Sequence, residues 1–109
     1  MKKTLREVGK VRLELIPAAA MREEAKALDH GNRKNGRKPF NWRKSRVSAR
    51  DQVGGSLRHI GLFMEGVDYD AASLAHHLGH ARARLGIILD ALHHGKLIDD
   101  RVIGKRAKR

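Results

Sequence analysis

Apolar residues in the segment 74–92 recur at alternating steps of four and three, a spacing that an α-helix places on one face. These residues are Leu74, Leu78, Ala81, Leu85, Ile88 and Leu92. A seam of this kind packs one helix against others in a bundle. Asp70 or Ser73 is placed to cap the helix, and Gly95 is placed to end it after His94. The segment therefore predicts a long, bundle-forming helix.

Two earlier segments show the same helical spacing. Met21, Ala25 and Leu28 predict a helix over about 18–30, with Pro17 before its first turn and Gly31 as its end. The next helix starts after Ser48 and Asp51, which resemble a capping box, and stops near Gly66. Its glycines 54 and 55 weaken the first turns and leave its start poorly defined. The face expected to pack in the core consists of Val53, Leu57, Ile60 and Met64.

The composition fits a small helical protein. The chain has 109 residues, of which 40% are hydrophobic and only 4% aromatic, so its core must be aliphatic. We therefore predict an all-α fold, a small bundle of three main helices completed by homodimerisation through the seam. Residues 1–98 are expected to form a single domain with an extended basic lead-in, and residues 99–109 a basic C-terminal tail.

Several classes of protein are disfavoured. The chain has no cysteine, which excludes disulfides, thiolate catalysis and sulfur-based zinc sites. Charged residues interrupt the apolar positions of the first 15 residues, so no signal peptide is expected. No apolar run approaches the length needed to span a membrane. These features predict a cytoplasmic protein without a membrane partner.

The charge balance predicts an anionic partner. The formal net charge is +12 and the pI is about 10.9. The segment 31–46 is a basic loop with seven lysines and arginines and no acidic residue, and it includes Phe40 and Trp42. The charge alone does not distinguish nucleic acid, free nucleotide or an acidic surface.

Five of the seven histidines lie between residues 73 and 95. His77 and His80 share a stripe with Ser73 and Arg84 at the border of the predicted core. Two histidines three positions apart can hold one metal ion when carboxylates join them. The alternative is that these histidines are hydrogen-bonded packing residues, which is the commoner role of a histidine at such a border.

Six motifs together carry a resemblance to a known family. They are GKVRLELIP, GNRKNG, NWRK, LRHI, EGVDYD and HLGHA, in this order over residues 9 to about 92. In order and spacing they resemble the phage-associated dATP/dGTP diphosphohydrolase N-terminal domain. The family's pattern reads approximately Gly-Lys-x-Arg-x-Asp-Leu-Ile-Pro, Gly-Ala-x-Lys-Tyr-Gly, Asn-Trp, Leu-Arg-His, Glu-Gly-Glu-Asp-x-Asp and His-Leu-Ala-His-Ala.

The resemblance implies a helical protein that hydrolyses purine deoxynucleoside triphosphates to monophosphate and pyrophosphate. Such an enzyme would act with Mg²⁺ or Mn²⁺, as the similar MazG-like pyrophosphohydrolases do. It would control nucleotide pools in the host cytoplasm if a phage encodes the chain.

Matching motif positions suggest a role for each candidate residue. Glu65, Asp68 and Asp70 would hold the metal. Catalytic roles fall to Glu65, Asp68, His59, His77 and His80, whose imidazoles would position water or contact phosphate. The nucleotide-binding candidates are Lys10, Arg12, Asn41, Trp42, Arg58 and Arg84. Among these, Trp42 could stack on the purine and Asn41 could read its edge.

Two departures from the family pattern weaken the expectation of catalysis. Ala72 stands where the family has the glutamate of an Asp-Pro-Glu-Ser-Gly segment. Arg84 stands where the family has an asparagine, one turn after the HLGHA motif. A lost carboxylate and an added cation disfavour metal and favour anions. Two alternatives to the hydrolase therefore stay open: a hydrolysis-deficient protein that sequesters nucleotide, and a small basic protein that binds nucleic acid through the loop 31–46 and the C-terminal tail.

Overall fold

The computed structural model describes residues 9–34, 36 and 38–104. Its helices are α2 (Ala18–Lys34), α3 (Ala49–Met64) and α4 (His77–His93), with two short 3-10 helices, η1 (Leu13–Leu15) and η2 (Asn41–Lys44). Two short strands, β1 (Val47–Ser48) and β2 (Leu97–Ile98), pair in parallel. The predicted helical fold with three main helices is confirmed, and the small strand pair is an addition that the sequence did not predict.

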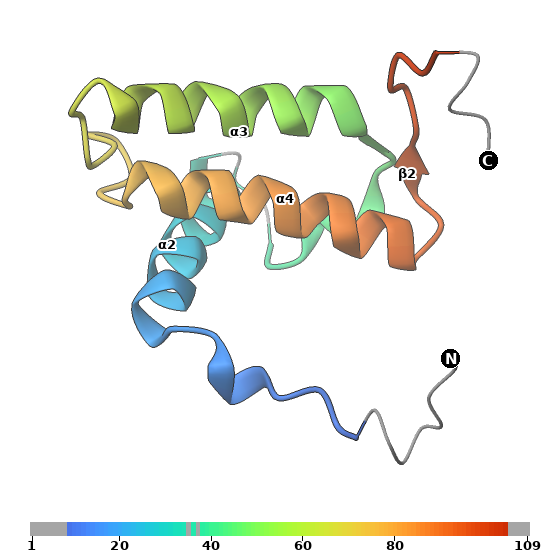
Figure 1. The fold of residues 1–109 in the computed structure, drawn as a ribbon, viewed down its shortest axis with the longest axis horizontal. Coiled ribbons are helices and arrows are strands. Elements are labelled where there is room, and N and C mark those ends of the chain that lie inside the picture. Colours follow the sequence, from blue (N-terminus) through green and yellow to red (C-terminus); the bar gives the residue numbers. More distant parts are fainter. Residues whose placement is uncertain (1–8, 35, 37, 105–109) are drawn as a thin grey trace.

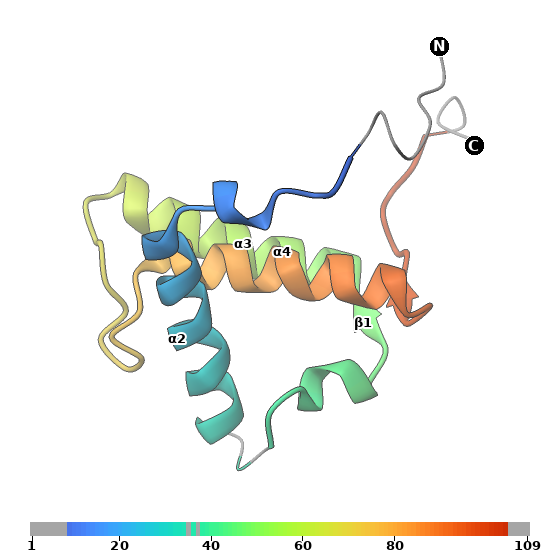
Figure 2. The ribbon, with the colours of Figure 1, turned by 90° about the horizontal axis from the view of Figure 1, so that it is seen from below.

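Helices α3 and α4 form a two-helix layer. They run in opposite directions side by side, joined by the turn that follows Met64 (Figure 1). Helix α2 packs against α4 on one side of this layer, and η2 lies on the same side (Figure 2). None of the described helices is long and apolar enough to cross a membrane.

Helix α3 begins as the sequence predicts. The Ser48 hydroxyl accepts a hydrogen bond from the Asp51 N–H at 3.2 Å, which satisfies one of the free donors of the first turn. The same hydroxyl donates to the Asp100 carboxylate, which also accepts from the Arg50 N–H. Residues just after β2, at the start of the predicted basic tail, are therefore attached to the start of α3.

Helix α4 begins later than predicted. The predicted caps, Asp70 and Ser73, instead form the preceding turn, in which an Asp70 carboxylate oxygen accepts from the Ser73 N–H at 2.9 Å. Leu74 takes a left-handed conformation in this turn, and the His76 imidazole caps the helix by accepting from the Leu78 N–H. The predicted end is confirmed, because Gly95 has a φ of 68° just after the helix.

Helix α2 continues past its predicted end at Gly31. It runs to Lys34, so the first residues of the predicted basic loop are helical. A glycine inside a helix costs only about 1 kcal/mol, which later residues can offset. Here Arg33 pairs with Asp29 one turn earlier at 3.0 Å, and the basic side chains of the last turn favour the helix dipole.

The helices meet through small residues. A Cβ atom added to Gly79 of α4 would lie 2.6 Å from the backbone carbonyl of Glu23 in α2. One added to Gly55 of α3 would overlap the side chain of Arg84. The glycine that seemed only to weaken the start of α3 thus leaves room for the side chain of Arg84.

The core is correspondingly small. Its buried hydrophobic residues are Ala27, Val47, Ala49, Ala75, Ala81, Ala83 and Ala91. The prediction that the large apolar residues of α3 fill the core is wrong, because Leu57 is 60% and Met64 76% exposed. The predicted seam of α4 is also mostly exposed, and only its Ala81 is buried. Close contact through glycine and alanine leaves the larger side chains outside.

Candidate functional site

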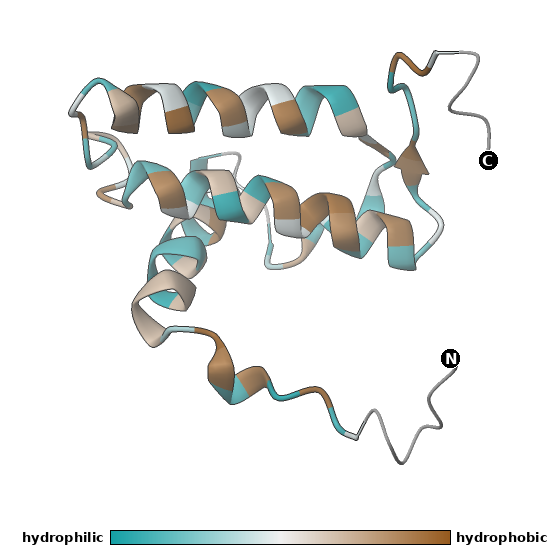
Figure 3. Cartoon of the chain, in the orientation of Figure 1, coloured by the Kyte–Doolittle hydropathy of each residue, from teal (hydrophilic) through white to brown (hydrophobic). Residues whose placement is uncertain are grey.

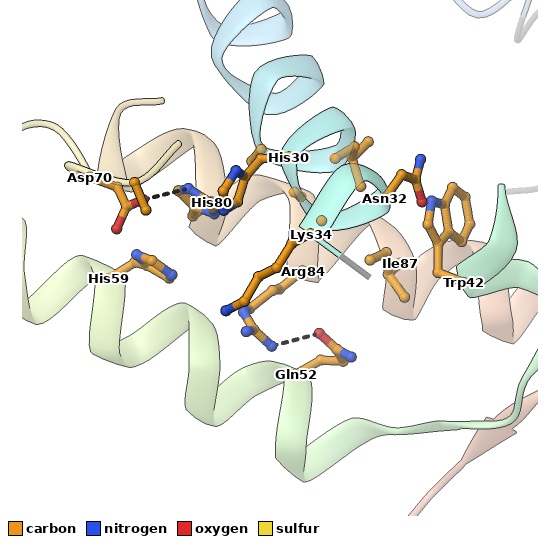
Figure 4. A pocket seen from close by; sticks show the side chains of 15 residues that line it. His30, Asn32, Lys34, Trp42, Gln52, His59, Asp70, His80, Arg84 and Ile87 are labelled. Carbon is orange, nitrogen blue, oxygen red and sulfur yellow. Dashed lines mark hydrogen bonds and ion pairs between the residues drawn. The ribbon is translucent and has the colours of Figure 1, made fainter. Parts of the chain in front are cut away.

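A pocket of about 440 Å³ opens between α2, α3 and α4 and is bordered by η2 (Figure 4). This volume lies in the range of small-molecule binding sites. Its polar and aromatic lining residues are His30, Asn32, Lys34, Trp42, Gln52, His59, Asp70, His80 and Arg84. Two of these side chains are permanent cations and only one is a carboxylate, so the pocket favours an anion.

The local fold explains this set of residues. The extension of α2 beyond Gly31 places Asn32 and Lys34 at the pocket. On α4, His80 and Arg84 are four residues apart and therefore lie on one face. On α3, Gln52 and His59 are seven residues apart, two helical turns, and lie on one face as well.

Arg84 is held beside the pocket without a carboxylate partner among the described residues. Its guanidinium donates to the side-chain oxygen of Gln52 at 3.1 Å, a neutral acceptor. Desolvation and, second, the charge of nearby Arg58 lower the pKa of Arg84. A cation that has lost part of its hydration and is not neutralised by an acid is suited to bind an anionic ligand.

Three histidines form a cluster at the other end of the pocket. The His59 and His80 rings stack with centroids 4.5 Å apart. The Nδ1 atoms of His59 and His77 lie 2.8 Å apart, so one ring donates a hydrogen bond and the other accepts it. His80 Nε2 lies 2.6 Å from the Ser73 hydroxyl and 3.8 Å from the Asp70 carboxylate (Figure 4).

The surroundings of His59 and His80 favour the neutral form of these two imidazoles. Desolvation lowers the pKa of His59 to about 4, and the charges of His80, His77 and Arg84 act in the same direction. Desolvation also lowers the pKa of His80, although the carboxylate of Asp70 opposes this shift. The pKa of Asp70 is lowered because, against the desolvation of its charged form, hydrogen bonds from Ser73 stabilise the carboxylate.

The pocket brings together five of the residues that the sequence singled out, namely Trp42, His59, Asp70, His80 and Arg84. His77 is buried and touches the pocket only through His59, a packing position that matches the simpler interpretation of a border histidine.

The remaining candidates do not line the pocket. Glu65 is the exposed C-terminal cap of α3, and Asp68 follows in the turn, where its backbone carbonyl accepts from the His77 N–H. Asn41 opens η2 beside Trp42, and Arg58 is exposed on α3. Lys10 and Arg12 lie in the exposed segment before η1, where Arg12 pairs with Glu14 at 3.0 Å.

Comparison with protein-family models gives one finding that matches this geometry. Residues 2–101 match the model described as "dATP/dGTP diphosphohydrolase, N-terminal". The chain belongs to this family. Comparisons with curated proteins and with solved structures found no match.

The metal that the family implies does not fit the side chains as they stand. In the described part of the chain, no group of three histidine, aspartate or glutamate side chains is placed to hold a metal ion. Asp70, the one carboxylate of the pocket lining, is engaged by Ser73. Ala72 also lines the pocket, at the position where the family pattern has an acid. Val67, within EGVDYD, stands at another glutamate position of the pattern.

Two acidic residues of α2, Glu23 and Glu24, also do not supply carboxylates to the pocket, because their side chains bind other groups. Glu23 accepts from the His76 N–H at 2.7 Å and pairs with Lys26, and Glu24 pairs with Arg82 at 3.1 Å. They join α2 to α4 and to the turn before it, and neither lines the pocket.

Sequence reasoning missed four polar residues of the pocket, His30, Asn32, Lys34 and Gln52. Two of them, Asn32 and Lys34, follow from the longer α2, which the glycine at position 31 concealed, whereas His30 lies inside the helix that the sequence predicted. Gln52 could have been found, because it shares a helical face with His59 through Ser56, at steps of four and three.

Proposed function

We propose that the chain binds a purine deoxynucleoside triphosphate in the pocket between α2, α3 and α4. The observation that carries this proposal is the pairing of an unneutralised arginine with a tryptophan in one cavity. Arg84 and Lys34 supply positive charge for phosphates, and Trp42 supplies an aromatic face for a base.

The arrangement of side chains supports one orientation of the nucleotide. Trp42 and Asn32 lie at one end of the pocket, and Lys34 and Arg84 lie between them and the histidine cluster (Figure 4). A purine stacked on Trp42 would present its polar edge to the Asn32 amide. Its phosphates would then extend toward Arg84 and the imidazoles of His30 and His80.

Binding without hydrolysis is the form of this function that the pocket favours. A triphosphate brings several negative charges, and Arg84 and Lys34 would offset part of them without a metal ion. Hydrolysis to monophosphate and pyrophosphate with Mg²⁺ or Mn²⁺ is the second candidate, and membership of the family supports it.

Fluorescence tests the binding directly, because Trp42 is the chain's single tryptophan. Titration with dATP or dGTP should change its emission and saturate. Arg84→Gln should weaken binding roughly 10- to 100-fold, the loss expected for a charged hydrogen bond of about 1.5–3 kcal/mol. Arg22→Gln, which removes an exposed charge of α2 outside the pocket, is the matched control. Equal losses in both variants would show that the weaker binding reflects the overall charge of the chain and not a contact made by Arg84.

Turnover separates the two candidates. Purified protein is incubated with each deoxynucleoside triphosphate and Mg²⁺ or Mn²⁺, and the products are resolved by chromatography. Retained, unchanged nucleotide supports sequestration. Pyrophosphate that disappears in Asp70→Asn, which removes the one carboxylate of the pocket lining, supports the hydrolase. Absence of nucleotide binding, together with steeply salt-dependent binding to random DNA or RNA, would favour the nucleic-acid alternative.

A further inference from the structure

The side of the α3/α4 layer that faces away from the pocket is bare and apolar. Its residues, which we call the apolar face, are Val53, Leu57, Ile60 and Met64 of α3 and Leu78, Leu85, Leu89 and Leu92 of α4. All eight are at least 36% exposed, and Leu57, Met64, Leu89 and Leu92 are at least 60% exposed.

Helical geometry places the apolar face opposite the pocket. Two residues along an α-helix correspond to a rotation of about 200°. Leu78 is two residues from His80, and both Leu85 and Leu89 are two residues from Ile87, whereas His80 and Ile87 line the pocket. Leu57 stands in the same relation to His59. Figure 2 shows α2 and η2 extending from one side of the layer, and Figure 3 shows apolar residues along both α3 and α4.

The chain needs a cover for this face wherever it is folded. Its buried hydrophobic residues are six alanines and one valine, and none of its described leucines, isoleucines, methionines or phenylalanines is buried. Since burial of large apolar side chains is the main favourable term in folding, a single copy has little to stabilise it. A second copy is the one partner that is always present at the chain's own concentration.

The extent and spacing of the apolar face fit such a partner. Eight side chains with these exposures present an area on the order of 800 Å², which is what one partner contributes to a standard interface. The steps of four and three along α3 match those of helices that pack in four-helix bundles. We propose that a second copy packs its own apolar face here, so that two α3/α4 layers form a four-helix bundle with one nucleotide pocket on each outer side.

The net charge of the chain predicts how salt should affect the dimer. Each copy has a formal net charge of +12, so long-range repulsion opposes the contact between apolar faces. Added salt screens the repulsion and should tighten the dimer. Salt should instead weaken attachment of an acidic partner protein to the same basic chain.

Sedimentation of the purified chain tests the dimer. The wild-type chain should sediment as a dimer at micromolar concentration, and its dissociation constant should fall between 0.1 and 0.5 M NaCl. Leu57→Glu combined with Leu89→Glu should give a monomer. Val102→Glu is the control, because Val102 is 88% exposed but lies beyond β2. A wild-type monomer at both salt concentrations overturns the proposal, and so does a dimer that persists in the double variant.

A second measurement uses a less disruptive substitution and tests the dimer even if the double variant does not fold. The chain has no cysteine, so Leu89→Cys introduces a single thiol on the apolar face. Its alkylation rate should fall at least severalfold as chain concentration rises from nanomolar to micromolar, whereas the rate for Val102→Cys should stay constant. A Leu89→Cys rate that does not depend on concentration would overturn the proposal.

Discussion

The two sides of the α3/α4 layer differ in nearly every physical respect. One side carries α2, η2 and a pocket with two permanent cations and three histidines, and the other carries eight large apolar side chains that are each at least 36% exposed in the described part of the chain. Both sides are built from the same two helices. The difference teaches that in a chain of this size a polar cavity occupies space that a core would otherwise fill, so that apolar burial has to be found on the opposite side.

The difference between the two sides of the layer can be altered most strongly by changing the charge of the pocket. Ala72→Glu combined with Arg84→Asn would add a second carboxylate to the lining that contains Asp70 and remove one of its cations. Hard divalent cations prefer oxygen ligands, so Mn²⁺ binding should tighten roughly 10- to 100-fold, the range that changes around metal sites produce. Calorimetry measures the affinity, and chromatography measures any pyrophosphate released.

A matched variant controls for added charge. Ala71→Glu with Arg84→Asn has the same composition change, but residue 71 is exposed and does not line the pocket. Equal Mn²⁺ binding by the two double variants would show that the position at 72 has no particular role.

The packing of α2 is the second feature to alter, because α2 is the longest element that covers the pocket side of the layer. Gly79→Ala would press a methyl group against the Glu23 backbone and should lower the free energy of unfolding by about 1–3 kcal/mol. Gly61→Ala is the control, since a Cβ there meets no other atom within 4 Å, and replacing a helical glycine should stabilise by about 0.5–1 kcal/mol. Urea unfolding measures both, and similar values for the two would contradict the close contact.

The sequence predicted the elements better than their contacts. Ser48 with Asp51 marks the start of α3, and Gly95 marks the end of α4, because caps depend on residues within one turn. The large apolar stripes were read as core-facing, as periodicity alone suggests. Periodicity identifies an apolar face but not the neighbour that covers it, and here glycine and alanine make the contacts within one chain.

For the candidate site, too, the sequence predicted which residues matter better than where they lie. Trp42, His59, Asp70, His80 and Arg84 were singled out by motif and do line one pocket. The acidic residues Glu65 and Asp68 occupy motif positions as well, yet they lie at the exposed end of α3. A motif records which residue types occur in order, whereas the direction of a side chain depends on where each helix begins and ends.

The histidine cluster, which lies on the pocket side of the layer, gives the smallest of the expected effects. The folded chain keeps His59 neutral down to about pH 4, whereas an ordinary histidine in the unfolded chain binds a proton near pH 6.5. Between these values the unfolded state binds more protons, so the free energy of unfolding should fall as pH decreases from about 6.5 to about 4. His80, whose pKa is also lowered, acts in the same direction.

Because solvent reaches the cluster, the part due to His59 should amount to only about 1 kcal/mol. Urea unfolding at pH 4.5 and pH 7 measures it in the wild type and in His59→Gln, which cannot take up the proton and should reduce the difference. His93→Gln, at an exposed position in the last turn of α4, should leave the difference unchanged. If His59→Gln retained the full pH dependence, the assignment to His59 would be wrong, and His80, whose pKa is also lowered by desolvation, would be its source.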